Sequence, residues 1–510
     1  DAQQSYFNYD EDEEEERAEV VDHNISFREG TSRRGEATFC PRLLLFDRKT
    51  NFGALSRTNE LYDDVTGEAG PDPSLWDGSV YEIRQDRIPQ SQYQDRIDEE
   101  IDEEPYEPTS RLQRDEATGP IIQSSDVRYW SDYNRVYYLP RSVHKLPDAA
   151  DFDNSGEDWQ NGKEVFERYD SDAALMEESF RLFMEECDSF QGLSVATDST
   201  TFGSFTASFL TAFRDEYTKS PSMVFPILSE AVPEHVEADD TLGIRRVLND
   251  ALLLRSLNEM SSLNIPLQNP RTWKKGRWSE DLNLNLLSSY EVSAVLSAHV
   301  ETSTLPLRLK ATAHMSELCH ELNLHGNTPF VELSGAFPAL SAESLDQRLH
   351  NFSCSEPGAA EGNAVVFYKD VARGSQDAVL HRSGNVPTTG SISSLIQAPV
   401  PYPLPSSYPS FFRAPHLNDQ PRRTSRGILT KPRYAPILSS IGLSSGIPAM
   451  FESYASFLED RVRKKFDWYL VGIDGDEAKG LTDDLWTICD NFGVSVRSEN
   501  ADSLGEDEEA

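Results

Sequence analysis

The chain has 510 residues, of which 87 are acidic and 47 are Lys or Arg, so its formal net charge is −40. This charge repels nucleic-acid phosphates, so direct binding of DNA or RNA is not expected. Because 38% of the residues are hydrophobic and 10% aromatic, most of the chain can bury a core, and wholesale disorder is excluded.

Targeting and redox features indicate a reducing, cytosol-facing compartment. No apolar run reaches the roughly 18 to 20 residues of a spanning helix, so no transmembrane segment is expected. Residues 1–12 have neither the apolar core of a signal peptide nor an Arg-rich transit character. The five cysteines are scattered without a CxxC pair, so neither a disulfide framework nor structural zinc is predicted.

Acidic stretches interrupt the chain from its first residues to its last. Three of them are predicted to be solvated: Asp10–Glu16, Tyr81–Glu107 and Glu499–Glu509. The second is too long and too charged for an ordinary connection, which predicts a disordered insertion at about residues 56–125. Before it, the apolar run Cys40–Asp47 is predicted to be one buried strand whose start is set by Pro41.

The clearest architecture lies at residues 171–228. Ser171 or Asp172 is predicted to cap a helix, and the alternation of Leu193 and Val195 predicts a strand after it. Aromatic residues then recur on one face of a second helix: Phe205, Phe209, Phe213 and Tyr217. A further apolar strand is predicted at residues 223–228, followed by a helix from about residue 244. Strand, turn, helix and strand form a βαβ unit, which requires a parallel, covered sheet.

Beyond residue 300 the chain is richer in Ser and Pro, and less regular structure is expected. The proline-rich stretch 399–415 could dock in polyproline form, but a loop anchored by its own aromatic residues is favoured. A basic group between Arg422 and Arg433 could meet an acidic surface or lipid headgroups, although a solvated loop or contact with the acidic segments is favoured. Two amphipathic helices are predicted to end the fold.

The turn at residues 197–204 is the most informative candidate site. A strand that ends in a small-residue turn before a helix offers unpaired backbone N–H groups to an anion such as phosphate. Loops that bind nucleotide phosphates usually need several glycines, whereas Gly203 is the one glycine here. An ordinary capped turn is therefore favoured over a phosphate site.

Other candidate chemistry is weak. The residues His314, Cys319, His320 and His325 do not have HExxH spacing, so ordinary histidines on a helix surface are favoured and no metal site is predicted. The sequence offers no local reason to pair any Ser or Cys with a distant His, so a nucleophilic hydrolase is not expected.

Five blocks, in order, resemble the tubulin superfamily. Residues 187–192, Cys-Asp-Ser-Phe-Gln-Gly, are similar to the CDxxQG segment that precedes the tubulin phosphate loop, and residues 214–217 resemble the REEY that ends the following helix. The other blocks are Pro41–Asp47, similar to VPRAVLVD, Gly156–Lys163, similar to GNNWAKGH, and Lys465–Glu477, similar to FLHWYTGEGMDE. The acidic C-terminal tail of the sequence is also similar in composition to the acidic tail of tubulins.

Within that superfamily, the acidic insertion and the segments FGSFTASFLTAFRDEY and PYPLPSSYPSFF resemble the misato family of divergent tubulin-like proteins, and fungal misato-like proteins in particular. The resemblance implies a role in mitochondrial partitioning and mitochondrial DNA inheritance. It implies a peripheral or cytosol-facing mitochondrial location, with some protein in the cytoplasm. Its partners are expected to be proteins, cytoskeletal or mitochondrial-surface. The family's first strand and its GQ-containing turn are not in the sequence, so we expect that Asp1 is not the native start.

The departures from tubulin bear on mechanism. The tubulin loop GGGTGSG corresponds to residues 199–205, where one glycine remains. The resemblance gives these candidate nucleotide-binding residues: Ser199, Thr200, Thr201, Gly203, Ser204 and Asn249, the last being similar to the base-contacting asparagine of DNEAL. The catalytic NxDxxE pattern is absent around residues 299–307, where Glu301 is the one carboxylate. No enzymatic activity and no cofactor are expected, with GTP binding left open.

The sequence thus predicts a tubulin-like α/β fold with a Rossmann-like parallel-sheet domain, a smaller α+β domain and C-terminal helices, interrupted by acidic disordered insertions. The predicted segments are an acidic segment at 1–24, the α/β domain at 25–265, the α+β domain at 266–450, C-terminal helices at 451–495 and an acidic tail at 496–510. The favoured function is a non-catalytic mitochondrial partitioning factor that acts through protein contacts. The alternatives are a GTP-binding or GTP-hydrolysing polymer former and an acidic adaptor for an assembly or chaperone complex.

Overall fold

A computed structural model describes the ordered framework of the chain. The described residues are 1–6, 21–31, 37–55, 88–95, 122, 124–146, 159–310, 314–323, 326–339, 345–354, 367–374, 392–398, 401–413, 422–423, 429–430, 433–444 and 446–502. The acidic run at residues 10–16 and most of the insertion predicted at 56–125 lie outside them. By contacts the chain forms two compact units, unit 1 (residues 1–148, 403–411 and 419–433) and unit 2 (149–402, 412–418 and 434–510). The domain borders given above stay predictions.

Unit 1 is built from short strand pairs. Strand β1 (Phe27–Thr31) pairs antiparallel with β2 (Ala37–Pro41), and β3 (Leu45–Arg48) pairs parallel with β4 (Val143–Leu146). The single strand predicted for residues 40–47 is therefore wrong. Pro41 ends β2 instead of starting a strand, because the chain turns at Arg42, whose backbone N–H donates to the Ser26 carbonyl at 2.9 Å.

The βαβ unit predicted from the sequence is confirmed in unit 2. Strands β5 (Leu193–Asp198), β6 (Ser222–Ile227) and β7 (Leu263–Asn264) form one parallel sheet in that order. Helix α5 (Gly203–Glu216) connects β5 to β6, and α6 (Thr241–Met260) connects β6 to β7. Phe205, Phe209 and Phe213 of α5 are buried, as their helical spacing predicts.

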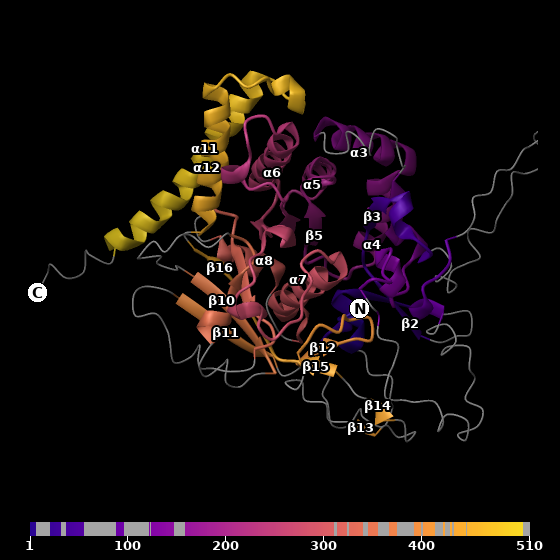
Figure 1. The fold of residues 1–510 in the computed structure, drawn as a ribbon. Helices are drawn as coiled ribbons and strands as arrows, with labels where there is room; N and C mark the ends of the chain where they lie inside the picture. Colours follow the sequence, from indigo (N-terminus) through magenta and orange to yellow (C-terminus); the bar gives the residue numbers. More distant parts are fainter. Residues whose placement is uncertain are drawn as a thin grey trace, which may run out of the picture. The chain divides into compact units, whose positions relative to one another are not determined.

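The single helix predicted to begin at Ser171 or Asp172 is divided in the structure. Helix α3 (Trp159–Ala173) lies beside α5 (Figure 1) and runs through Ser171 and Asp172, so the predicted cap at those residues is wrong. The chain breaks at Ala174, which has φ 47°, and continues as a π-helical segment (Leu175–Phe180) and helix α4 (Arg181–Glu185). Asp170 supplies the cap instead, because its Oδ1 accepts the backbone N–H of Met176 at 3.0 Å.

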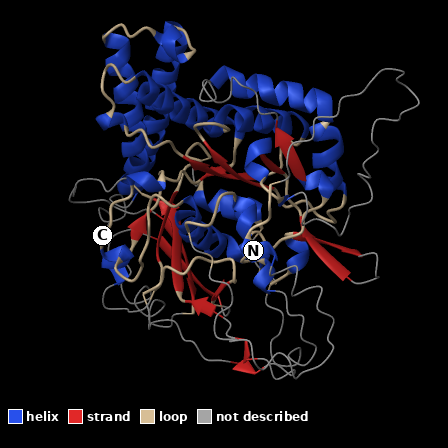
Figure 2. Cartoon of the chain, turned by 45° about the vertical axis from the view of Figure 1, so that its right-hand side comes forward, coloured by secondary structure: helices blue, strands red, loops and turns tan. Residues whose placement is uncertain are grey.

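Unit 2 also contains a mixed sheet of five strands, in the order β11-β10-β16-β8-β9. Strands β10 and β11 are parallel, and the other neighbours are antiparallel. The strands are β8 (Glu332–Ala336), β9 (His350–Asn351), β10 (Phe367–Arg373), β11 (Ile392–Ala398) and β16 (Ile437–Leu443). Helix α7 (Ser289–Thr304) packs on β16, β10 and β8. Figure 2 shows the strands lying among helices.

Two long helices end the described chain, as predicted. Helices α11 (Gly446–Arg463) and α12 (Gly475–Asp502) lie side by side (Figure 1), and α12 also contacts α6. Helix α12 extends into the segment predicted as acidic tail. The remaining elements are α8 (Met315–Leu322), α9 (Leu345–Arg348), β12 (Tyr402–Leu404), β13 (Arg422–Arg423), β14 (Leu429–Thr430) and β15 (Arg433–Ala435).

Burial in the proline-rich stretch agrees with the loop that the sequence favours. Tyr402, Tyr408 and Phe411 are buried there, so aromatic residues anchor the segment. Across the described part of the chain, every helix is too short or too polar to cross a lipid bilayer.

The contact between α7 and the five-stranded sheet generates a stability prediction. A Cβ added at Gly335 of β8 would lie 2.5 Å from the His299 ring and 2.5 Å from the Leu438 carbonyl oxygen. We expect Gly335→Ala to lower the free energy of unfolding by roughly 1–3 kcal/mol, measured by urea denaturation, because neither buried neighbour can move away. Gly480→Ala in α12 is the control: its Cβ would meet nothing within 4 Å, and a gain of up to about 1 kcal/mol is expected. Equal stability of the two variants would contradict this packing.

Candidate functional site

Two backbone N–H groups of the turn between β5 and α5 are hydrogen-bonded within unit 2. The Thr201 N–H donates to Asp198 Oδ1 at 2.6 Å, and the Ser199 N–H donates to the Ile227 carbonyl at 2.9 Å. Asp198 is the last residue of β5, so its carboxylate places negative charge in the turn. A phosphate site needs the opposite arrangement, with unpaired donors and no competing anion.

The start of α5 is covered by α3. Gly203 is the first residue of α5, and a Cβ there would lie 3.3 Å from Cζ3 of Trp159. One turn further along α3, a Cβ at Gly162 would overlap Oγ of Ser204. The block that contains Trp159 and Gly162 therefore packs directly against the turn, and both glycines serve close helix contact.

A buried carboxylate, Asp250 of α6, joins this turn to three other parts of unit 2. Its Oδ1 accepts the Ser199 hydroxyl and the Ser229 N–H, the latter at 2.9 Å. Its Oδ2 accepts the Ser229 hydroxyl at 2.7 Å and the Tyr454 hydroxyl of α11 at 3.0 Å. Burial raises the pKa of Asp250 to about 6, although each of these hydrogen bonds acts to lower it. Asp250 is fully buried, so these donors are what makes its ionised form tolerable there.

Sequence reasoning missed Asp250 and named its neighbour. Asn249 also lies in α6 and is buried, with 2% of its surface exposed. The sequence did contain a signal for Asp250. It is an ionisable residue within the otherwise mostly apolar run Leu248–Leu254, and the apolar residues of that run are fully buried.

The structure places the other predicted site residues in one turn. Ser199, Gly203 and Ser204 are buried, whereas Thr200 and Thr201 are half-buried. Asp250, next to Asn249, connects α6 to Ser199. A role of these residues in nucleotide binding stays a prediction.

Glu301, the one carboxylate near the expected catalytic position, forms a buried ion-pair network. Its Oε1 is 2.8 Å from Arg308 Nη2, and its Oε2 is 2.7 Å from Arg373 Nη1. The three side chains are 7%, 9% and 0% exposed. The Arg373 guanidinium also lies over the Tyr402 ring, 5.5 Å from its centroid. Both carboxylate oxygens are therefore already bound to cations, which opposes proton transfer from a water to Glu301.

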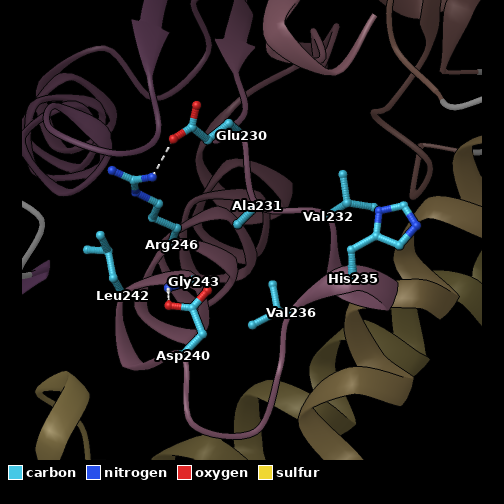
Figure 3. Close-up of a pocket in the computed structure, with 9 residues that line it drawn as sticks. All are labelled: Glu230, Ala231, Val232, His235, Val236, Asp240, Leu242, Gly243 and Arg246. Atoms are coloured by element: carbon cyan, nitrogen blue, oxygen red, sulfur yellow. Dashed lines mark hydrogen bonds and ion pairs between the residues drawn. The ribbon is translucent and has the colours of Figure 1, made fainter. Parts of the chain in front are cut away.

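A cavity of about 250 Å³ lies between the loop after β6 and the start of α6 (Figure 3). Its two acidic side chains are bonded locally: Glu230 pairs with Arg246 at 2.6 Å, and Asp240 accepts the backbone N–H of Gly243 at 2.9 Å. A hydrogen bond from Arg271, at 2.9 Å, lowers the pKa of Glu230 most strongly. The cavity walls also include four apolar side chains: Ala231, Val232, Val236 and Leu242. Sequence reasoning missed this cavity, and the one local signal was Asp240, a residue type that often caps helices.

The histidine group lies on a helix surface, as favoured from the sequence. His314 precedes α8 and His320 lies in it, both exposed, whereas Cys319 is buried. His325 lies outside the described residues. Among the residues that the structure describes, no group of three or more His, Cys, Asp or Glu side chains is placed to bind a metal ion.

Comparisons with known proteins identify relatives of most of the chain. A family model described as a tubulin domain matches residues 119–309, and one described as the Misato Segment II tubulin-like domain matches residues 1–99. The chain is 34% identical over 313 residues to protein dml1 of Aspergillus niger, which covers 60% of this chain and 58% of the relative. It is 32% identical over 353 residues to protein dml-1 of Neurospora crassa, which covers 68% of this chain and 60% of that relative. For protein dml1 of Schizosaccharomyces pombe the identity is 28% over 316 residues, covering 60% and 61%. The chain thus spans less than two thirds of the length of each relative.

The shifted pKa of Asp250 predicts a specific pH dependence. Its folded pKa of about 6 lies above the ordinary value of 3.8, so the stability it contributes is present below 3.8 and is lost as the pH rises through about 6. Asp250→Asn removes this titration. We therefore expect the stability deficit of the variant, measured by urea denaturation, to shrink as the pH rises through that range. Asp483→Asn, on the exposed side of α12, is the matched control. A deficit that stays constant with pH would show that Asp250 does not titrate as stated.

Proposed function

Because this chain belongs to the Misato family of tubulin-like proteins, we propose that it is a non-catalytic factor in mitochondrial partitioning and mitochondrial DNA inheritance that acts through protein contacts. The family and the tubulin-like fold predicted from the sequence are confirmed by the two family-model matches. The mitochondrial part of the proposal, with a peripheral or cytosol-facing location, follows from the resemblance described above. The cytoplasm is the second expected location.

The observation that carries the non-catalytic part is the Asp198 carboxylate in the β5–α5 turn. It accepts the Thr201 N–H, one of the groups that a nucleotide phosphate would need. A phosphate that displaced it would meet a like charge, which costs about 4 kcal/mol at 4 Å and an effective dielectric constant of about 20. The packing of Trp159 against Gly203 supports the same conclusion, because it fills space next to the turn.

The environment of Glu301 supports the absence of hydrolysis. Nucleoside triphosphate hydrolysis needs a polar group that positions the attacking water. Glu301 is bound by Arg308 and Arg373 in the interior of unit 2, where it stabilises those two buried cations. Removing it would leave both guanidiniums uncompensated, so its role is structural.

A nucleotide-binding polymer former remains the second candidate, favoured by one observation. The β5–α5 turn lies at the carboxyl end of a parallel strand, where open α/β sheets bind their ligands. The acidic adaptor is a third candidate, favoured by the net charge of −40, which would attract basic partners.

Titration with GTP distinguishes the first two candidates. We expect no saturable heat when GTP and magnesium are titrated into the purified chain by calorimetry, and no phosphate release above the buffer blank. Asp198→Asn removes the competing carboxylate charge and is the sensitised variant, in which any residual binding should increase. Micromolar binding with turnover by the unaltered chain would refute the non-catalytic proposal.

A rescue experiment tests the mitochondrial role separately. Cells depleted of the protein are expected to lose mitochondrial DNA and to distribute mitochondria unevenly, and the unaltered gene should restore both. The double variant Thr200→Ala with Thr201→Ala should rescue equally well, because the proposal assigns the turn no nucleotide chemistry. Normal mitochondrial inheritance after depletion would refute the mitochondrial role. Failure of a folded double variant to rescue would favour the nucleotide-binding candidate.

A further inference from the structure

We propose that an exposed cationic loop of unit 2, residues 271–278, docks on a lipid surface that carries anionic headgroups. The sequence of this loop is Arg-Thr-Trp-Lys-Lys-Gly-Arg-Trp. In a chain with 87 acidic residues, the segment 261–279 contains no Asp or Glu. The cationic loop is therefore a local reversal of the charge that dominates the molecule.

Three of its four cations are available to a partner. Arg271 is paired with Glu230 at 2.9 Å. Lys274, Lys275 and Arg277 are exposed, and within the described part of the chain no carboxylate pairs with them. Glu280 is the next carboxylate along the chain, so the stretch 274–280 carries three exposed cations and one exposed carboxylate.

Aromatic packing beneath the cationic loop fixes its shape. Trp273 is buried and lies 5.2 Å from the Phe352 ring, and Trp278 stacks on His350 at 4.4 Å and 18°. The Trp278 Nε1–H donates to the Lys274 carbonyl at 2.9 Å, which closes the loop. The three free cations thus project from a rigid base, so little backbone entropy is lost when they bind.

The tip of the cationic loop projects from the protein surface. Lys274, Lys275, Gly276 and Arg277 are consecutive exposed residues, and a Cβ at Gly276 would meet one neighbouring atom, in Trp278. A projecting tip can touch a flat surface, whereas an extended acidic peptide needs a groove along which to lie. The shape therefore favours a planar partner.

The strength of binding also favours lipid over an acidic peptide. An exposed pair between one cation and one carboxylate gains at most about fivefold in affinity and is often neutral. Each Lys or Arg near an anionic leaflet raises the affinity about fivefold, and it does so without having to pair with one particular atom. Carboxylates that lie more than about 8 Å from the loop act weakly on it, because charges at that distance are screened at physiological salt.

The test is flotation of the full chain with vesicles of phosphatidylcholine, with and without phosphatidylserine. We expect partitioning onto the anionic vesicles that is lost at high salt. Combining Lys274→Gln, Lys275→Gln and Arg277→Gln should weaken it about a hundredfold. The matched control combines Arg463→Gln, Lys464→Gln and Lys479→Gln, cations that are 71%, 61% and 61% exposed and pair with carboxylates of α11 or α12. It changes the net charge equally and should leave partitioning within a few fold of the unaltered chain.

Three results would overturn the proposal. These are equal partitioning onto both kinds of vesicle, equal partitioning by the loop and control variants, and binding of soluble polyglutamate through the loop without vesicle binding. Circular dichroism establishes that the variants are folded. If the triple variant is not folded, Lys275→Glu alone should still weaken partitioning by more than fivefold. The assay contains no nucleotide and no mitochondria, so its outcome is separate from that of the proposed function.

Discussion

The buried carboxylate of Asp250 is the constraint around which unit 2 is arranged. An ionised carboxylate in an apolar interior is tolerated only when hydrogen-bond donors surround it, and Asp250 receives them from the β5–α5 turn, the loop after β6 and helix α11. Each of those segments is therefore fixed in place by the same group. A segment that moved away would leave a buried charge without its full set of donors, which is far more costly than losing one surface contact.

Glu301 is a second buried carboxylate that holds separate segments of unit 2 together. It neutralises Arg308, seven residues further along, and Arg373 at the end of β10, and so connects α7 to the five-stranded sheet. An acidic group near the expected catalytic position thus serves the interior of the fold. Packing and polar satisfaction of this kind can maintain a tubulin-like framework, since a fold does not by itself prescribe a ligand chemistry.

The sequence predicted the parts of the fold that depend on local pattern. The aromatic repeat from Phe205 to Phe213 identified α5, and the apolar runs on either side identified β5 and β6, because side-chain periodicity follows directly from backbone geometry. The single strand at residues 40–47 is wrong because the backbone N–H of Arg42 bonds to Ser26, where the chain turns. The cap at Ser171 is wrong because the N–H of Met176 bonds to Asp170 instead. The distant partners of Asp250 and Glu301 could not be predicted from local pattern, since 204 residues separate Asp250 from Tyr454 and 72 separate Glu301 from Arg373.

The long sequence separation between Asp250 and Tyr454 has a consequence for synthesis of the protein. At a translation rate of about 5–20 residues per second, the 204 residues between them take roughly 10–40 s to emerge from the ribosome. During that interval the α/β sheet can form, but the carboxylate lacks its last donor, and the nascent chain carries an incompletely satisfied interior. Completion of the first half of unit 2 therefore waits until α11 has been synthesised.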